Sequence, residues 1–245
     1  KHRRRQRQMC IRDSNYIYQN IFLGSKNKLK KFNENLKFEN LFQPERKELI
    51  KNHFRLKGSW KDYFNNDHPI ILELGCGKGE YTCSLAKKYP SKNFIGFDIK
   101  GARIWSGAKQ SLQKNLKNTC FIRSQIELLE FFFSENEISE IWITFPDPQI
   151  KIQRQKHRLV NLKFLNIYKK IIKPQGIVHL KTDCEFLHGY ALGLIDGLKL
   201  KIINSNHDIY SNNNAPEDAI NIKTHYEKIF LSKNSLYCGL TSVSS

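Results

Sequence analysis

The chain has 245 residues, of which 40% are apolar, and its 41 lysines and arginines exceed its 23 aspartates and glutamates by 18. A globular protein with a full core is therefore expected, and the positive charge favours a polyanionic partner; a basic surface that serves only solubility is the alternative. No stretch approaches the ~20 apolar residues that cross a membrane, and the six cysteines and eight histidines lack metal-site spacing, so we expect a reduced cytoplasmic protein, monomeric or homodimeric, without membrane anchor or metal.

The first residues differ in texture from the rest of the chain. Residues 1–14 read KHRRRQRQMCIRDS, in which MCIRDS resembles the read-through of a sequencing adapter, and we expect residues 1–25 to be a non-native or disordered extension. Leaving out residues 1–14 removes six Lys/Arg and one Asp and gives a net charge of +13, so the basic excess belongs to the remaining chain. Residues 26–68 are polar with short apolar patches and are expected to form an N-terminal extension that packs on the core.

From residue 69 onward, strand patterns alternate with helix patterns. We expect strands at 70–75, 93–99, 119–124, 140–146, 176–182, 199–206 and 235–240, and helices at 80–90, 102–116, 126–133, 161–172 and 185–198. This alternation predicts an α/β fold with a mostly parallel, seven-stranded sheet and helices on both faces. Ligands of such sheets bind at the carboxyl ends of the strands, so chemistry is expected at that edge.

A glycine-rich turn, ELGCGKGEY, follows the first strand. Gly75, Gly77 and Gly79 leave room for a ligand to approach the backbone, and their G-x-G-x-G spacing differs from the G-x-G-x-x-G of dinucleotide sites. Glu73 stands just before the loop, where a carboxylate would attract a cationic amino-acid end; a helix-cap or salt-bridge role is the alternative. Asp98 ends the second strand, where an acid can accept both hydroxyls of a ribose.

Together, these residues resemble the S-adenosylmethionine site of Rossmann-like class I methyltransferases. The resemblance implies that the loop after the third strand flanks the adenine of the cofactor. In this chain Ser124 and Gln125 occupy that loop, and Ser124 stands where the pattern usually has an acid.

The fourth strand runs into FPDPQIKIQRQKHR, residues 145–158. Proline donates no amide hydrogen and fixes its own φ, so Pro146 and Pro148 stiffen the backbone around Asp147. A plain surface turn would explain the prolines but not their place at this strand end. The basic residues that follow form either a phosphate clamp for an RNA backbone or a solvated segment, and they are Lys151, Arg154, Lys156, His157 and Arg158.

The FPDP motif with its basic run, together with NLFQP, ELGCGKGEYT, KTDCEF and THYE, resembles the bacterial tRNA (guanine-N7)-methyltransferases from about Lys26 to the C-terminus. The resemblance implies a Rossmann-like class I methyltransferase domain over residues 69–245, with residues 26–68 on the core and RNA side. It implies methyl transfer from S-adenosylmethionine to N7 of the variable-loop guanine of tRNA. This chain has Gln149 where the family often has Trp, and His225 where it commonly has Lys or Glu.

Site residues carry over by position. The resemblance implies cofactor contacts at Glu73, Asp98 and Asp147, with Asp147 catalytic in the active site. It implies that substrate contacts come from Lys151, Asp183, Thr224, His225, Tyr226 and Glu227, to which the clamp interpretation adds Arg154.

The expected chemistry needs no general base, because guanine N7 carries a lone pair and no proton. Alignment and electrostatics then carry catalysis. We hypothesise that Asp147, with Asp183 or Glu227, accepts hydrogen bonds from guanine N1 and N2 and compensates the cationic product. Tyr226 would pack against the base, a core tyrosine being the alternative.

Three other functions stay open. The first is a methyltransferase of the same fold that acts on another RNA, a protein or a small molecule, and the second is a non-catalytic RNA-binding relative. The third, an NAD-dependent oxidoreductase, is disfavoured by the glycine spacing.

Overall fold

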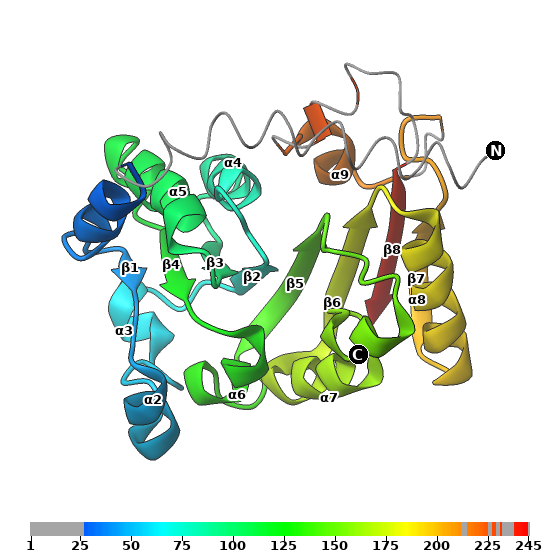
Figure 1. Ribbon diagram of the computed structural model, residues 1–245, viewed down its shortest axis with the longest axis horizontal. Coiled ribbons are helices and arrows are strands. Elements are labelled where there is room, and N and C mark those ends of the chain that lie inside the picture. Colours follow the sequence, from blue (N-terminus) through cyan, green and yellow to red (C-terminus); the bar gives the residue numbers. More distant parts are fainter. Residues whose placement is uncertain (1–26, 212–214, 225–226, 229–230, 232–237, 245) are drawn as a thin grey trace.

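The computed structural model describes residues 27–211, 215–224, 227–228, 231 and 238–244. Within these ranges the chain forms an eight-stranded sheet in the order β1-β4-β3-β2-β5-β6-β8-β7 (Figure 1). The strands are β1 Leu41–Phe42, β2 Ile70–Leu74, β3 Asn93–Asp98, β4 Thr119–Arg123, β5 Ile138–Thr144, β6 Ile172–Thr182, β7 Lys201–Asn206 and β8 Gly239–Ser244. β1 to β6 pair in parallel, and β8 runs antiparallel to both β6 and β7.

Helices cover both faces of the sheet (Figure 1). They are α2 Arg46–Asn52, α3 Trp60–Phe64, α4 Glu80–Lys88, α5 Gly101–Gln113, α6 Leu129–Phe132, α7 Leu162–Ile171, α8 Glu185–Gly197 and α9 Glu217–Asn221, with 3-10 turns η1 Ile126–Leu128 and η2 Ile152–His157. The main core joins α2, α3, α6, α7 and α8 to one face of the sheet, whereas α4 and α9 pack on the other face around Ile71 and Trp142. The strands alternate their buried side chains between these two layers, as a sheet covered on both sides requires.

The predicted α/β architecture is confirmed, with one strand more than predicted. The extra strand, β1, consists of two residues in the N-terminal extension and pairs with β4. So short a strand shows no alternation that a sequence pattern could reveal. The last strand also lies further along the chain than the predicted 235–240, of which residues 235–237 fall outside the described residues.

The N-terminal extension is built into the core. The Trp60 ring is fully buried, and its Nε1 donates to the Phe132 carbonyl at 3.1 Å. Residues 27–35 are helical and lie against α5 (Figure 1), where the Asn35 side chain donates to the Gly101 carbonyl at 2.9 Å and the Trp105 indole donates to Glu34 at 2.8 Å. Because α5 follows directly after β3, this helix lies beside the carboxyl end of that strand.

No helix in the described ranges is long and apolar enough to cross a membrane. Among the same residues, no group of three or more His, Cys, Asp or Glu is placed to hold a metal ion.

Candidate functional site

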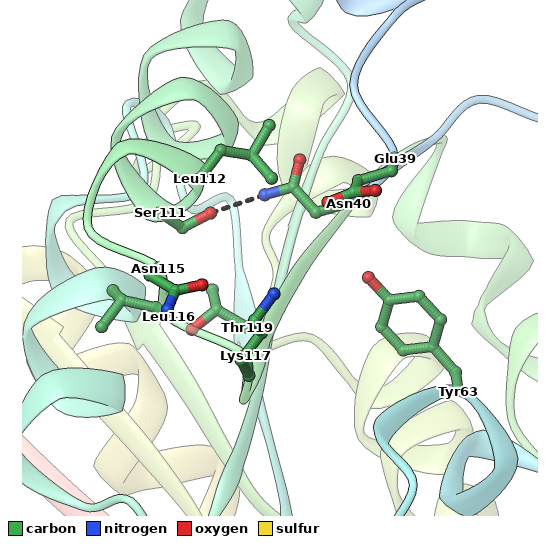
Figure 2. Close-up of a pocket in the computed structure, with 9 residues that line it drawn as sticks. All are labelled: Glu39, Asn40, Tyr63, Ser111, Leu112, Asn115, Leu116, Lys117 and Thr119. Carbon is green, nitrogen blue, oxygen red and sulfur yellow. Dashed lines mark hydrogen bonds between the residues drawn. The ribbon is translucent and has the colours of Figure 1, made fainter.

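Two of the cavities in the described part of the chain lie at opposite ends of the strands. The smaller, of about 80 Å³, is at the carboxyl ends and is lined by Glu73, Gly75, Cys76, Gly77, Lys78, Glu80, Tyr81, Arg103, Thr144, Phe145 and Thr224. The larger, of about 280 Å³, includes Thr119, the first residue of β4, and is crossed by a hydrogen bond from Asn40 to Ser111 (Figure 2). Because parallel α/β sheets bind ligands at the carboxyl ends of their strands, the smaller cavity is the candidate site.

The glycine loop bends through the left-handed region, with φ values of 72°, 56° and 71° at Gly75, Gly77 and Gly79. A Cβ at Gly79 would lie 2.6 Å from the Phe121 ring and 2.9 Å from the Gly107 Cα, so this glycine lets α4 approach β4 and α5 closely. A Cβ at Gly77 would meet nothing nearer than the Gly75 carbonyl at 3.9 Å. The loop is therefore packed tightly on its inner side and open at Gly77, where a ligand can approach the backbone.

Asp98 fixes the loop from the end of β3. Its Oδ2 accepts from the Gly77 amide at 2.8 Å and its Oδ1 from the Lys100 amide at 2.7 Å. Its carbonyl accepts from the Ser124 amide at 3.2 Å, which draws the loop after β4 to the same place. A carboxylate has about four acceptor positions, so each oxygen keeps one for a further donor.

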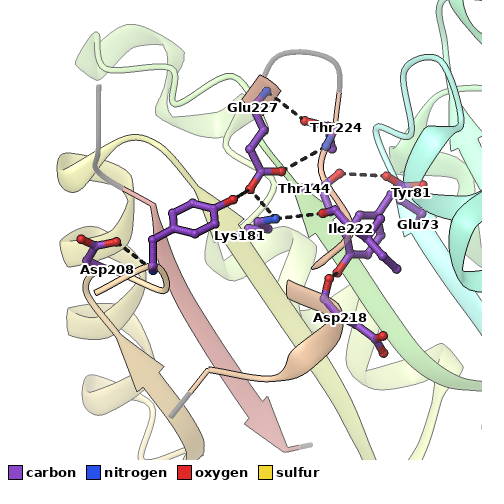
Figure 3. A network of polar contacts seen from close by, with 10 residues as sticks. Glu73, Tyr81, Thr144, Lys181, Asp208, Asp218, Ile222, Thr224 and Glu227 are labelled. Atoms are coloured by element: carbon purple, nitrogen blue, oxygen red, sulfur yellow. Dashed lines mark hydrogen bonds and ion pairs between the residues drawn. The ribbon is translucent and has the colours of Figure 1, made fainter. Parts of the chain in front are cut away.

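Glu73 is a buried carboxylate that ties β2 to α4 and β5. Its Oε2 accepts from the Thr82 amide at 2.9 Å and from the Thr82 hydroxyl. Its Oε1 accepts from the Thr144 hydroxyl at 2.8 Å (Figure 3). Burial raises the pKa of Glu73 to about 7, although the hydrogen bonds from Thr82 and Thr144 act to lower it. Burial thus favours the protonated carboxyl, and a nearby cationic ligand would favour the ionised form.

The FPDP corner departs from the sheet through two strained residues. Phe145 and Gln149 have φ values of 47° and 46°, a conformation that costs a non-glycine residue roughly 1–3 kcal/mol and persists only where surrounding contacts offset that cost. The Phe145 amide donates to the Lys181 carbonyl at 2.8 Å, and Asp147 Oδ1 accepts from the Gln149 amide at 3.1 Å. The exposed Asp147 carboxylate thereby has one oxygen engaged within the corner and the other available.

Arg158 is buried and binds the backbone of this corner. Its predicted role in the phosphate clamp is therefore wrong. Its Nε donates to the Pro148 and Gln149 carbonyls at 3.3 and 3.2 Å, and its Nη2 donates to the Ile150 carbonyl at 3.3 Å. The guanidinium is also stacked on the rings of Phe186 and Tyr190, and the side chain is 4% exposed. Because the guanidinium is buried between these carbonyls and rings, a phosphate in solvent cannot reach it.

The remaining basic residues of the run are exposed. Residues 151–157, which include η2, have no buried member, and Ile150 and Ile152 are exposed beside Lys151. Lys151 and Arg154 therefore stand on a surface segment that starts a few residues after Asp147.

The predicted C-terminal site residues are only partly described, because His225 and Tyr226 lie outside the described residues. Thr224 lines the cavity. Glu227 is buried: its Oε1 is 2.6 Å from Lys181 Nζ and accepts from the Tyr210 hydroxyl, and its Oε2 accepts from the Thr224 amide at 3.1 Å (Figure 3). In this conformation both Glu227 oxygens are occupied by protein donors.

Three further predicted residues lie around the same edge of the sheet. Ser124 and Gln125 follow β4, and the Gln125 side-chain oxygen accepts from the Arg46 guanidinium of α2. Asp183 follows the end of β6 and is exposed.

Some of the residues that shape the site were missed by sequence reasoning. Thr82 and Thr144 bind Glu73, and Lys181 binds Glu227. Thr82 stands in the first turn of the helix after the glycine loop, where the backbone amides lack helical partners and can donate to a nearby carboxylate. Its contact with Glu73 could therefore have been anticipated. Lys181 stands in the buried part of β6, and a lysine in a buried strand usually has a charged partner, so an ion pair could also have been anticipated.

The raised pKa of Glu73 predicts how stability changes with pH. The folded protein keeps this proton to about pH 7, whereas the unfolded chain loses it near 4.5, so the unfolded chain binds fewer protons between these values. The free energy of unfolding should therefore fall as pH rises through this window, by at most about 1.4 kcal/mol per pH unit from this group. Glu73→Gln has no proton to lose and should remove that slope; denaturant unfolding of both proteins from pH 4.5 to 7.5 measures it, and a difference that is constant with pH would contradict the assignment.

The role of Arg158 predicts a second effect. Lysine in its place keeps the charge but cannot reach three carbonyls, so Arg158→Lys should lower the free energy of unfolding by about 1–3 kcal/mol. The matched control is Arg154→Lys in the exposed run, which should stay within about 0.5 kcal/mol of the parent in chemical denaturation. Equal effects of the two substitutions would show that Arg158 does not support the corner.

The comparisons with known proteins agree with one another. The family described as "Putative methyltransferase" matches residues 67–238. The chain is 60% identical over 210 residues to a tRNA (guanine-N(7)-)-methyltransferase of Christiangramia forsetii, covering 85% of this chain and 94% of the relative. It is 49% identical to the enzyme of the same description from Porphyromonas gingivalis, covering 74% and 73%.

Solved structures support the fold. A structure described as an antibiotic-related methyltransferase matches with a TM-score of 0.58 at 16% identity, over 77% of this chain and 92% of the other. The 16S rRNA methyltransferase KamB also matches with a TM-score of 0.58, at 12% identity, over 76% and 92%. The resemblance carried by the glycine loop and the FPDP corner is thus confirmed over most of the sequence, and the chain belongs to the tRNA (guanine-N7)-methyltransferase family.

Proposed function

We propose that this protein transfers the methyl group of S-adenosylmethionine to N7 of the variable-loop guanine of tRNA, in the cytoplasm. The observation that carries the proposal is the juxtaposition of the exposed Asp147 corner with a glycine-loop cavity at one edge of the sheet. The choice of tRNA guanine as the substrate is supported by the two relatives at 60% and 49% identity, both described as tRNA (guanine-N(7)-)-methyltransferases.

The cavity residues fit S-adenosylmethionine, which supplies an electrophilic sulfonium methyl when bound. The open Gly77 would let the ligand approach the backbone, and the spare acceptor positions of Asp98 suit the two ribose hydroxyls. Glu73, whose pKa of about 7 makes it responsive to a cation, would face the positively charged amino-acid end. Ser124 and Gln125 would border the adenine. The Gly75–Gly79 turn would contact the middle of the ligand, between Glu73 and Asp98.

Asp147 is the proposed catalytic residue for the base. One of its oxygens is bound by the Gln149 amide, which leaves the other to accept from guanine N1–H or N2–H. This hydrogen bond would orient N7, and the carboxylate would stabilise the positive charge that the base gains on methylation. Asp183 is a second acceptor at the same sheet edge, whereas Glu227 would have to exchange Lys181 for the base.

The exposed run would hold the RNA backbone. Lys151 and Arg154 present their charges a few residues from Asp147, and Lys156 and His157 extend the surface. Phosphate contacts at this place would bring the RNA chain beside the target base. Thr224 at the cavity wall, with His225 and Tyr226 next in the chain, completes the proposed substrate set.

The reaction is tested with labelled methyl donor, unmodified tRNA and nucleoside analysis. The parent protein should form 7-methylguanosine, and Asp147→Asn, which keeps the shape but loses the charge, should lower kcat by about 10²-fold or more at saturating RNA. Full methylation by Asp147→Asn would contradict the catalytic role. Label in a nucleoside other than 7-methylguanosine would favour a methyltransferase with another target.

The clamp predicts a change in salt dependence. Replacing Lys151 and Arg154 together by alanine should reduce the slope of log K against log salt for tRNA binding by about 1.5–2, because two phosphate contacts are lost. The control pair is Lys199 and Lys201, which are exposed at the amino end of β7, far along the strands from the site. Binding titrations at several salt concentrations distinguish the pairs, and an unchanged slope for the first pair would refute the clamp.

A further inference from the structure

Lys181 is a lysine with no exposed surface, and its ammonium group lies over Tyr81 and Phe145, two residues that line the candidate site. It lies in β6, pairs in register with Thr144 of β5, and comes two residues before Asp183. Lysine is almost never fully buried unless its charge is paired, so a structural or chemical reason for its presence is required.

The ammonium group of Lys181 lies at the junction of three segments. Its Nζ is 2.6 Å from Glu227 Oε1 and donates to the Ile222 carbonyl at 3.2 Å (Figure 3). It also lies over the rings of Tyr81 in α4 and Phe145 in the corner, 5.8 and 5.4 Å from their centres. The side chain therefore contacts the helix after the glycine loop, the corner that carries Asp147, and Ile222 and Glu227 in the chain after α9.

The backbone of the same residue fixes the corner. The Lys181 carbonyl accepts from the Phe145 amide at 2.8 Å, and the neighbouring Thr144 binds Glu73. A displacement of Lys181 would thus affect Glu73 through Thr144, its partner in the neighbouring strand, and Asp147 through Phe145, two residues earlier in the chain.

The segment that Lys181 binds forms a wall of the cavity. Thr224 and Glu227 are joined reciprocally, since the Thr224 amide donates to Glu227 Oε2 at 3.1 Å and the Glu227 amide donates to Thr224 Oγ1 at 3.3 Å. The Lys228 amide closes the same turn on the Thr224 carbonyl at 3.0 Å. Because Thr224 lines the cavity, anchoring Glu227 also fixes the position of that wall.

A buried ion pair is weak support for stability, since an apolar pair of similar volume often serves as well, but it admits only one arrangement of its partners. Here the pair connects a central strand of the sheet to Glu227, whose other oxygen binds the Thr224 amide and which also accepts from the Tyr210 hydroxyl. We therefore expect the ion pair to fix the position of Glu227 more than it raises the free energy of unfolding.

We propose that Lys181 is a positioning residue: through its ion pair with Glu227 it holds Thr224 in place in the wall of the methyl-donor cavity. This inference rests on the proposed function, because it takes the cavity to be the donor site. It adds a residue that touches neither the methyl donor nor the guanine and that acts through Glu227, Thr224 and Phe145.

The test measures binding of S-adenosylmethionine to the RNA-free protein by calorimetry, so that any contact between Glu227 and guanine plays no part. Lys181→Met leaves a buried carboxylate without its partner and should weaken donor binding by about tenfold or more and lower Tm. The double variant Lys181→Met with Glu227→Gln removes both charges and should recover Tm to within about 2 °C of the parent, while donor binding stays about fivefold or more weaker.

Two controls separate position from stability. Phe133→Leu, in the core on the other side of the sheet, should lower Tm without changing the dissociation constant of the donor. Tyr210→Phe removes one hydrogen bond to Glu227 and keeps the ion pair, so its effect on donor binding should be smaller than that of Lys181→Met.

The outcomes are distinct. Recovery of both Tm and donor binding in the double variant would overturn the positioning role and leave the proposed function standing. A parent protein that does not bind S-adenosylmethionine at all would overturn the proposed function, and the positioning role with it.

Discussion

The hydrogen bond from the Phe145 amide to the Lys181 carbonyl is the contact on which the site depends. It extends the pairing of β5 with β6 by one residue beyond the Thr144–Lys181 register pair, after which Phe145 turns into the left-handed region and the chain leaves the sheet. This hydrogen bond sets the direction in which the chain, and with it Asp147, leaves the sheet. The prolines stiffen the corner, and the contacts of Arg158 then hold it in that direction.

The strain of the corner explains why so much of the surrounding structure binds to it. Phe145 and Gln149 both adopt a conformation that non-glycine residues avoid, and Arg158 supplies donors to three consecutive carbonyls between and beyond them. Arg158 is itself held by stacking on two aromatic rings of α8. A conformation this unfavourable persists because several independent contacts determine it together, and such over-determined strain is typical of functional positions.

Much of the fold was predictable because the strands are buried on both faces and separated by helices of clear period. The elements from β2 to β6 lie close to their expected places, and the glycine loop, Asp98 and Asp147 fall at the carboxyl edge because parallel connections bring those ends together. What the sequence could not show is the partner of each charge. Arg158 reads as one more base in an exposed run, and only the packing of α8 against the corner makes it a support. The two-residue β1 likewise depends on a neighbouring strand rather than on its own pattern.

The charges at this edge divide by burial into two kinds with different consequences. Glu73, Lys181 and Glu227 are almost completely buried, so their interactions are little screened by salt and fix the geometry of the cavity. Two of the segments that carry exposed bases are residues 151–157 after the corner and the helix 27–35, whose Lys28 and Lys30 are exposed where it packs on α5 beside the end of β3. Both segments lie beside the carboxyl ends of strands, the helix 27–35 near β3 and residues 151–157 after β5. The cavity lies between β3 and β5 at that same edge of the sheet. A polyanion that contacted both would therefore pass over the cavity mouth. The position of the exposed bases then matters more for binding such a partner than the net charge of +18. Added salt should weaken the binding of the polyanion and leave the buried ion pair and hydrogen bonds unchanged.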